Sequence, residues 1–194
     1  MTRQDNFPQM TLLVGLVLIL LALPFVTTYN DLLTALAMRL GLAQPLQSVS
    51  PIEARMVVAL IRAIGIHAAV AGSQLVVWGP DGTATNLFIS WNCIGWQSLV
   101  LLGASLAVGL RGGYSAEVRV QVVLIGLLGT VIVNLVRVAL VCMLAVVAGR
   151  TFALIFHDYG GTILTVLWLF AFWFGVHRWL LPVHVADELE TVAA

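Results

Sequence analysis

Three side chains in this sequence have the types needed for nucleophilic chemistry: the thiol of Cys93, the guanidinium of Arg137 and the imidazole of His157. A thiol attacks as the thiolate, whose pKa falls at a helix amino terminus or beside a cation. An imidazole can accept the thiol proton and return it to a leaving amine. A guanidinium can pair with a thiolate, an oxyanion or a substrate carboxylate. The three groups are therefore candidates for one site in which a thiol attacks, an imidazole moves its proton and a guanidinium holds an anion, if the fold brings them together.

Two asparagines lie beside these groups and are candidate supporting residues. Asn92 precedes Cys93 directly and is the expected amino-terminal cap of the apolar helix that follows. Asn134 lies one helical turn before Arg137, where it can orient that arginine or a substrate. We therefore expect both asparagines to lie at the same site.

Each candidate also has a structural interpretation. Cys93 taken alone is typical of a small buried residue at a helix start. Arg137 can extend its side chain to the lipid headgroups, and His157 can be an ordinary loop histidine. The second cysteine, Cys142, lies among Val, Ala and Leu and is most simply a packing residue, with a disulfide bond to Cys93 as the lesser alternative. The arrangement of the helices decides between these interpretations.

The composition points to a membrane protein. Of the 194 residues, 61% are hydrophobic and 9% charged, with net charge +0 and mean hydropathy +1.04. A soluble domain carries about 25% charged residues, and a nucleic-acid-binding protein needs a basic surface. The composition therefore excludes a soluble enzyme, a disordered chain and a nucleic-acid partner. About 20 residues cross a bilayer, so the chain has room for roughly four to six crossings.

The predicted fold class is a mainly α, polytopic membrane protein that forms one integral membrane domain over residues 1–194. Four apolar runs predict transmembrane helices at about residues 10–26, 94–110, 120–149 and 163–181. The first run lacks a cleavage pattern of small residues, which favours an uncleaved anchor over a signal peptide. The third run exceeds a perpendicular span, so it is either one long tilted helix or a helix that bends near Gly126 and Gly129.

Residues 27–92 form an insert that we expect to lie outside the membrane or at its interface. Ser50 and Pro51 are typical of a helix start, and apolar residues then recur every fourth position, which predicts an amphipathic helix over 52–66. Its apolar stripe is suited to the membrane surface. Two β-compatible stretches joined by the turn residues 79–82 predict a hairpin over 69–91 that runs into Cys93.

The predicted spans bring the three reactive groups to one membrane face. Cys93 opens the second span, and His157 lies in the link before the fourth. Arg137 follows Arg119 by 18 residues, or roughly 27 Å along the third helix, which places it near that same face. The arginines near the span ends favour cytoplasmic termini by a small margin. The active face is then extracytoplasmic.

The chain resembles the exosortase/archaeosortase family of membrane-embedded, transpeptidase-like sorting enzymes over roughly residues 52–181. That family carries a cysteine motif at the start of a span, an Asn-x-x-Arg within a later helix, and a His or Arg before the last span. The corresponding segments here are Trp91-Asn92-Cys93-Ile94-Gly95-Trp96, Asn134-Leu135-Val136-Arg137 and Phe156-His157-Asp158-Tyr159-Gly160. Ile94 departs from the Ser or Thr that is common after the cysteine, which bears on subfamily and sorting signal.

The resemblance implies an activity and its partners. The expected enzyme is a cysteine transpeptidase or peptidase of the cell (inner, cytoplasmic) membrane, with Cys93, Arg137 and His157 as its catalytic residues. Its substrate would be a secreted protein with a carboxy-terminal sorting signal and transmembrane helix, and its acceptor an amine, on a membrane lipid for example, or water. No metal or organic cofactor is indicated. The alternatives are a non-enzymatic scaffold, in which Arg137 pairs with Asp158, and a small transporter.

Overall fold

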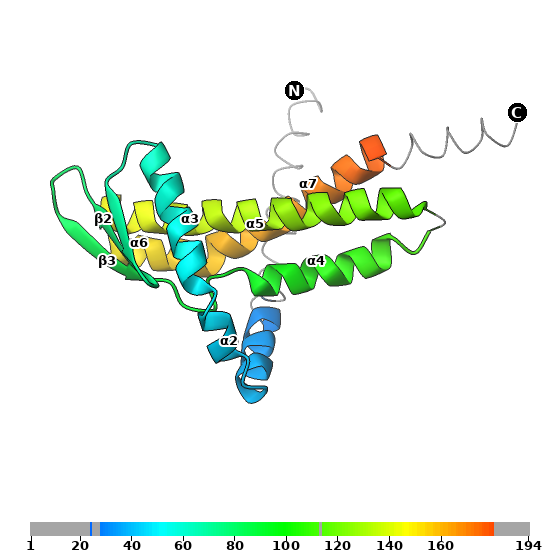
Figure 1. Ribbon diagram of the computed structural model, residues 1–194, viewed down its shortest axis with the longest axis horizontal. Coiled ribbons are helices and arrows are strands. Elements are labelled where there is room, and N and C mark those ends of the chain that lie inside the picture. Colours follow the sequence, from blue (N-terminus) through cyan, green and yellow to red (C-terminus); the bar gives the residue numbers. More distant parts are fainter. Residues whose placement is uncertain (1–23, 25–27, 113, 181–194) are drawn as a thin grey trace, which may run out of the picture.

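The computed structural model describes residues 24, 28–112 and 114–180 of the chain (Figure 1). The predicted first span, residues 10–26, thus lies outside the described residues apart from residue 24. After a helix over residues 28–39, the elements in chain order are α2 (Ala43–Gln47), α3 (Ser50–Ala63), β1 (Ala68–Ala71), β2 (Gln74–Trp78), β3 (Ala84–Phe88), α4 (Trp96–Gly109), α5 (Ala116–Val147), α6 (Arg150–Ile155), the π-helical turn η1 (Phe156–Gly160), α7 (Gly161–Gly175) and η2 (Val176–Leu180).

The longest helix of the described residues, α5, runs through most of the length of the structure (Figure 1). It begins where the side chain of Ser115 accepts a hydrogen bond from the backbone N–H of Val118 at 3.4 Å. The helix continues through Gly126 and Gly129 for 32 residues, so of the two predictions for the third run the single long helix holds. The two glycines make room for the aromatic rings of Phe172 and Trp168 on α7.

A second long helical segment, Arg150–Leu180, contains α6, η1, α7 and η2 without a break. The prediction that His157 lies in a link before the last span is therefore wrong. Residues 156–160 form a π-helical turn, in which the N–H of Gly161 bonds to the carbonyl of Phe156. Both Gly160 and Gly161 adopt right-handed helical φ and ψ, because the backbone of an apolar segment is best satisfied within a helix. Such π turns are frequent at functional sites.

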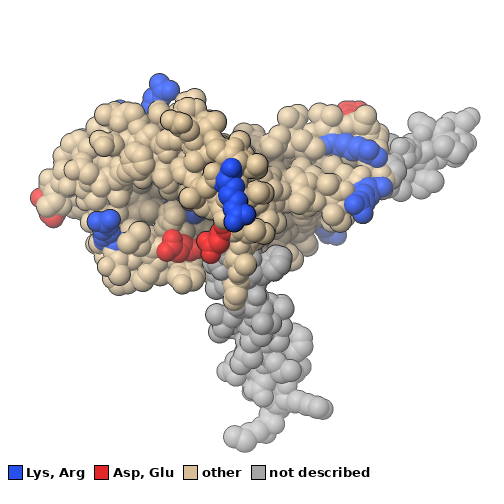
Figure 2. All heavy atoms as spheres, turned by 90° about the horizontal axis from the view of Figure 1, so that it is seen from below, with Lys and Arg blue, Asp and Glu red and all other residues tan. Residues whose placement is uncertain are grey.

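Within the described residues, two helices are long and apolar enough to cross a membrane, Ala116–Val147 and Arg150–Leu180. The apolar helix α4 is shorter, with 14 residues or about 21 Å against a hydrocarbon core of about 30 Å. The four-span prediction is thus supported for two of its helices. Charged side chains are few and scattered on the face that Figure 2 shows.

The insert combines α3 with a three-stranded antiparallel sheet of order β1-β2-β3. The predicted hairpin is present as β2 and β3, but the stretch predicted as its first strand is itself folded into two strands. Gly72, at φ +61°, lies in the two-residue turn that pairs Ala71 with Gln74. Reading the Gly-Ser pair at positions 72 and 73 as a turn would have predicted the extra strand.

Helix α3 is present close to its predicted bounds, and it has two apolar faces. The predicted stripe of Ile52, Met56, Leu60 and Ile64 is exposed, as a helix on a membrane surface requires. The opposite face packs against the sheet and the second half of α5, and this core contains Ala54, Val57, Val58, Ile61, Leu75, Val77, Val138, Ala139 and Cys142. Glu53 lies on this second, buried face.

Candidate active site

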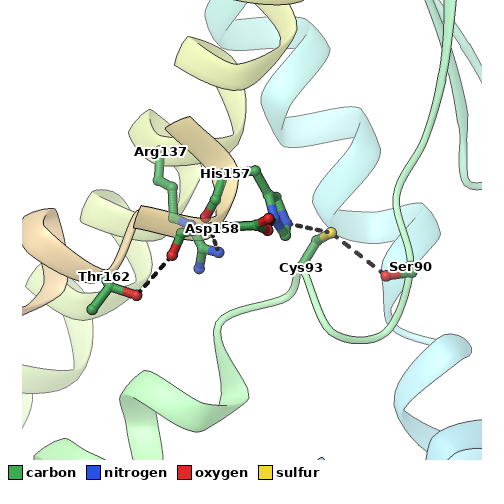
Figure 3. Close-up of polar contacts among 6 residues, drawn as sticks. All are labelled: Ser90, Cys93, Arg137, His157, Asp158 and Thr162. Atoms are coloured by element: carbon green, nitrogen blue, oxygen red, sulfur yellow. Dashed lines mark hydrogen bonds and ion pairs between the residues drawn. The ribbon is translucent and has the colours of Figure 1, made fainter. Parts of the chain in front are cut away.

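The structure brings Cys93, Arg137 and His157 together from three separate segments (Figure 3). Cys93 lies in the loop between β3 and α4, Arg137 on α5, and His157 in the π turn η1. The Sγ atom of Cys93 lies 3.5 Å from Nε2 of His157, and Nη2 of Arg137 donates to the carbonyl oxygen of His157 at 3.3 Å. The sulfur and the imidazole are thus within hydrogen-bond reach, and the guanidinium contacts the backbone of the same histidine.

A tight turn presents the thiol. The backbone N–H of Cys93 donates to the carbonyl of Ser90 at 2.9 Å, and Oγ of Ser90 lies 3.5 Å from the sulfur. Gly95 closes the turn at φ +74°, and a Cβ at this position would lie 2.6 Å from Cγ of Asn134. Glycine is therefore required there for both its conformation and its size.

The expected capping role of Asn92 is wrong. Gly95 is the amino-terminal cap of α4, and no side chain caps this helix. Asn92 instead accepts a hydrogen bond from Gln97 at 3.3 Å through its Oδ1 atom. The turn at Gly95 moves the helix start to Trp96, so Cys93 is three residues away from the amino terminus that was expected to activate it.

The surroundings of the thiol favour its ionisation. Burial by itself raises the pKa of Cys93, but hydrogen bonds to His157 and Ser90 and the charge of His157 outweigh it and lower the pKa to about 7. A substantial share of Cys93 is thus thiolate near neutral pH, as nucleophilic attack requires.

A carboxylate orients the imidazole. Nδ1 of His157 lies 2.9 Å from Oδ1 of Asp158, whose side chain is exposed. When Nδ1–H donates to this carboxylate, Nε2 is free to accept the thiol proton. The hydroxyl of Thr162 donates to the carbonyl of Asp158 at 3.1 Å and anchors the turn. From the sequence, Asp158 was expected only as an ion-pair partner of Arg137 in the scaffold alternative. In the structure, its carboxylate contacts His157.

Arg137 occupies a space that a glycine leaves open. A Cβ at position 161 would overlap Nε of Arg137. The guanidinium, His157 and Asp158 also line a cavity of about 380 Å³ that continues along Asn92, Thr162 and Thr165. The cavity thus presents a cation together with hydrogen-bonding groups.

Asn134 holds the cysteine loop from α5. Its Nδ2 atom donates to the carbonyl of Cys93 at 2.9 Å and to Oε1 of Glu53 at 2.6 Å. The residue is therefore at the site, as expected, but it fixes the cysteine rather than Arg137. The sequence prediction did not include Glu53, because the exposed stripe of α3 was taken as its only apolar face. The apolar residues Ala54, Val57 and Val58, in phase with Glu53, were the available signal.

The second cysteine, Cys142, lies outside this cluster and serves packing. Cys142 is a free thiol, 3% exposed in the apolar core, so the predicted packing role holds and no disulfide bond joins it to Cys93. Among the described residues, no three His, Cys, Asp or Glu side chains gather to hold a metal ion.

Comparison with known proteins gives one family. A family model described as transmembrane exosortase matches residues 5–174, which is 170 of the 194 residues and includes every group of the cluster. Neither the curated proteins nor the solved structures contain a match.

Proposed function

Because the chain belongs to the transmembrane exosortase family, we propose that it is a membrane-embedded cysteine peptidase or transpeptidase that cleaves the carboxy-terminal sorting signals of secreted proteins. The observation that carries this proposal is the 3.5 Å contact between the sulfur of Cys93 and Nε2 of His157, which joins residues 64 positions apart. The contact supplies a nucleophile and its general base, and Arg137 and Asp158 flank the pair.

The acylation step uses the three groups in turn. Nε2 of His157 takes the thiol proton, and the thiolate of Cys93 attacks the scissile carbonyl carbon, so that a C–S bond forms and the carbonyl electrons move to oxygen. Arg137 stabilises the resulting oxyanion. When the electrons return, the C–N bond breaks and His157 gives its proton to the leaving amine. The product is a thioester on Cys93 and a released carboxy-terminal fragment.

Deacylation reverses these roles. An acceptor amine, on a lipid for example, or water attacks the thioester while His157 takes its proton. The C–S bond then breaks, and His157 returns the proton to the sulfur, which restores the thiol. Asp158 holds the imidazole in one orientation through both steps. The cavity beside Arg137 and His157 offers room for the recognition segment of the substrate.

The setting of the reaction is the inner membrane, with the cluster facing the extracytoplasmic side. The arginines near the ends of the predicted spans favour this orientation. A secreted protein whose sorting signal includes a transmembrane helix then meets the enzyme laterally, with its recognition segment at the height of Cys93. The apolar helices Ala116–Val147 and Arg150–Leu180 are the surfaces available to such a helix.

The test is the processing of a co-expressed, signal-bearing substrate. Cys93→Ala and Cys93→Ser are expected to abolish processing while the abundance of the enzyme in the membrane stays constant. Cys142→Ala is the matched control, because it removes a thiol that is buried in the core instead of the cluster. Unchanged processing in both Cys93 variants would refute the enzymatic function and favour a scaffold, which tolerates Cys93→Ser.

A further inference from the structure

A buried carboxyl group lies behind the nucleophile. Glu53 is 4% exposed on the inner face of α3, and its Oε1 atom accepts the 2.6 Å hydrogen bond from Asn134, 81 residues away in the chain. Its other oxygen, Oε2, is buried without a hydrogen-bond partner among the described residues. The acylation steps do not use this group, although it is two hydrogen bonds away from the backbone of Cys93.

The surroundings of Glu53 favour its neutral form. The elements packed against this face of α3 are α5, β1 and β2, with α2 preceding it in the chain, and the strands and α2 contain no titratable side chain. The groups that act on its charge are Cys93 and Arg137, and no described cation lies within ion-pair distance of it. An ionised carboxylate with one unpaired oxygen is costly to bury, and the protonated acid much less so.

The same conclusion follows from the electrostatics. Burial and the negative charge of Cys93 raise the pKa of Glu53 to about 8, although Arg137 and the hydrogen bond from Asn134 act in the opposite direction. Glu53 and Cys93 thus oppose each other's ionisation. When the thiolate is present, the carboxyl group keeps its proton.

The amide of Asn134 connects this acid to the nucleophile. One nitrogen donates to both Glu53 and the carbonyl of Cys93, and Gly95 packs against the same amide. Loss of the Glu53 contact frees the amide to rotate, and the loop that carries the sulfur loses its anchor. The position of the sulfur relative to His157 therefore depends on an acceptor oxygen at position 53.

We propose that Glu53 is a positioning residue that works as a neutral carboxylic acid: through Asn134 it holds the Cys93 loop against His157, and it leaves the thiolate as the one negative charge of the two groups. This inference rests on the proposed role of Cys93 as the nucleophile. It assigns a function to α3, which carries none of the three groups that take part in acyl transfer.

The neutral form matters for the chemistry. A carboxylate at position 53 would add a second negative charge near the thiolate and compete with it for Arg137, which raises the cost of forming the nucleophile. A neutral acid supplies the same acceptor oxygen to Asn134 without that charge. Glutamine reproduces this geometry, and a shorter or apolar side chain does not.

The experiment measures the reactivity of Cys93 directly. The rate of iodoacetamide alkylation is followed from pH 5 to pH 10 in four full-length proteins, all with the Cys142→Ala substitution. These are the parent, which keeps Glu53, and its variants E53Q, E53D and E53L. Glu53→Gln is expected to keep the alkylation midpoint at about 7 and the rate at pH 7 within about twofold. Glu53→Asp and Glu53→Leu are expected to raise the midpoint by about one pH unit, which lowers the thiolate fraction at pH 7 about fivefold.

Controls separate this effect from folding and from the catalytic proposal. Arg55→Gln changes an exposed residue on the same helix and is expected to leave the alkylation curve unchanged. A carboxylic acid C=O band in the infrared spectrum at pH 7 that disappears in E53Q reports the proton directly, even if E53L does not fold. Because alkylation needs no substrate, these readouts stand whether or not Cys93 processes sorting signals.

Three results would overturn the inference. An E53Q curve shifted as far as that of E53L would mean that the carboxyl charge is needed. A lower midpoint in E53Q than in the parent would mean that Glu53 is ionised beside the thiolate. Identical curves for all four proteins would mean that position 53 does not position Cys93.

Discussion

The two halves of α5 pack against different partners and contain different kinds of residue. In the first half, Val118 and Val122 pack with Leu102 of α4 and with Phe172 and Val176 of the last helical segment, all 3% exposed or less. In the second half, Asn134 and Arg137 contact the cysteine loop and the π turn before the helix returns to apolar packing. The polar side chains of α5 that contact irregular backbone thus lie in its second half.

Each half of α5 meets α7 at a glycine that leaves room for a large side chain of the other helix, Gly129 on α5 in the first half and Gly161 on α7 in the second. At Gly129 the space is filled by the ring of Trp168, and at Gly161 the space is filled by the guanidinium of Arg137. Both contacts join α5 to α7, but only the second sets the position of a charged group. The comparison therefore predicts that equal changes in the two halves have unequal effects on stability and on processing.

Arg137→Lys is expected to have the largest effect. Lysine keeps the charge but loses the planar fork that donates to the His157 carbonyl and reaches the oxyanion, so processing falls by about 100-fold or more. The measurement is the initial rate of substrate cleavage per enzyme molecule. Arg119→Lys, an exposed arginine in the first half of α5, is the matched control and is expected to retain the rate. An equal loss of cleavage rate in both variants would mean that the effect does not depend on the position of Arg137 in the cluster.

A pair of glycine substitutions compares the two contacts. Gly161→Ala puts a Cβ against Nε of Arg137 and is expected to lower processing about tenfold or more, because the guanidinium must move away from the cluster. Gly129→Ala crowds the ring of Trp168 and is expected to cost about 1–3 kcal/mol of stability. Processing per folded molecule should stay unchanged in Gly129→Ala. If Gly129→Ala lowered processing and Gly161→Ala lowered only stability, the contact that matters for function would be the one in the first half of α5.

The reactivities of the two cysteines distinguish the cluster from the apolar core beside it. Cys93 belongs to the cluster, and Cys142 lies in the core on the second half of α5. Cys93 is expected to react with iodoacetamide along a curve that rises with pH and has its midpoint at about 7, because the thiolate is the reactive form. His157→Ala removes the hydrogen bond and charge that lower this pKa, so the midpoint moves upward. Cys142, 3% exposed, is expected to react only after unfolding. An alkylation midpoint that stays the same in His157→Ala would mean that His157 does not lower the pKa of the Cys93 thiol.

The sequence predicts which residues meet at the site better than it predicts how they are held. Spacing along apolar runs is enough to bring Cys93, Arg137 and His157 to one face, since helix rise is regular. The π turn at 156–160 and the left-handed conformation of Gly95 depend on contacts across the fold. Because Gly95 moves the start of α4 to Trp96, the prediction that Asn92 caps this helix was wrong. Glu53 was missed because two faces of one helix are apolar, and only the packing of α3 on α5 distinguishes them.

The smallest expected effect tests the first half alone. The indole N–H of Trp168 donates to Oγ1 of Thr130 at 2.9 Å, a side-chain hydrogen bond between α7 and α5. Trp168→Phe leaves the buried hydroxyl without this donor and is expected to cost about 1 kcal/mol, or a fall in Tm of about 2–4 °C. Trp179→Phe, at an exposed site, controls for the loss of an indole. If Trp168→Phe slowed processing instead of lowering Tm, the two halves of α5 would be coupled, and the separation drawn from their packing would fail.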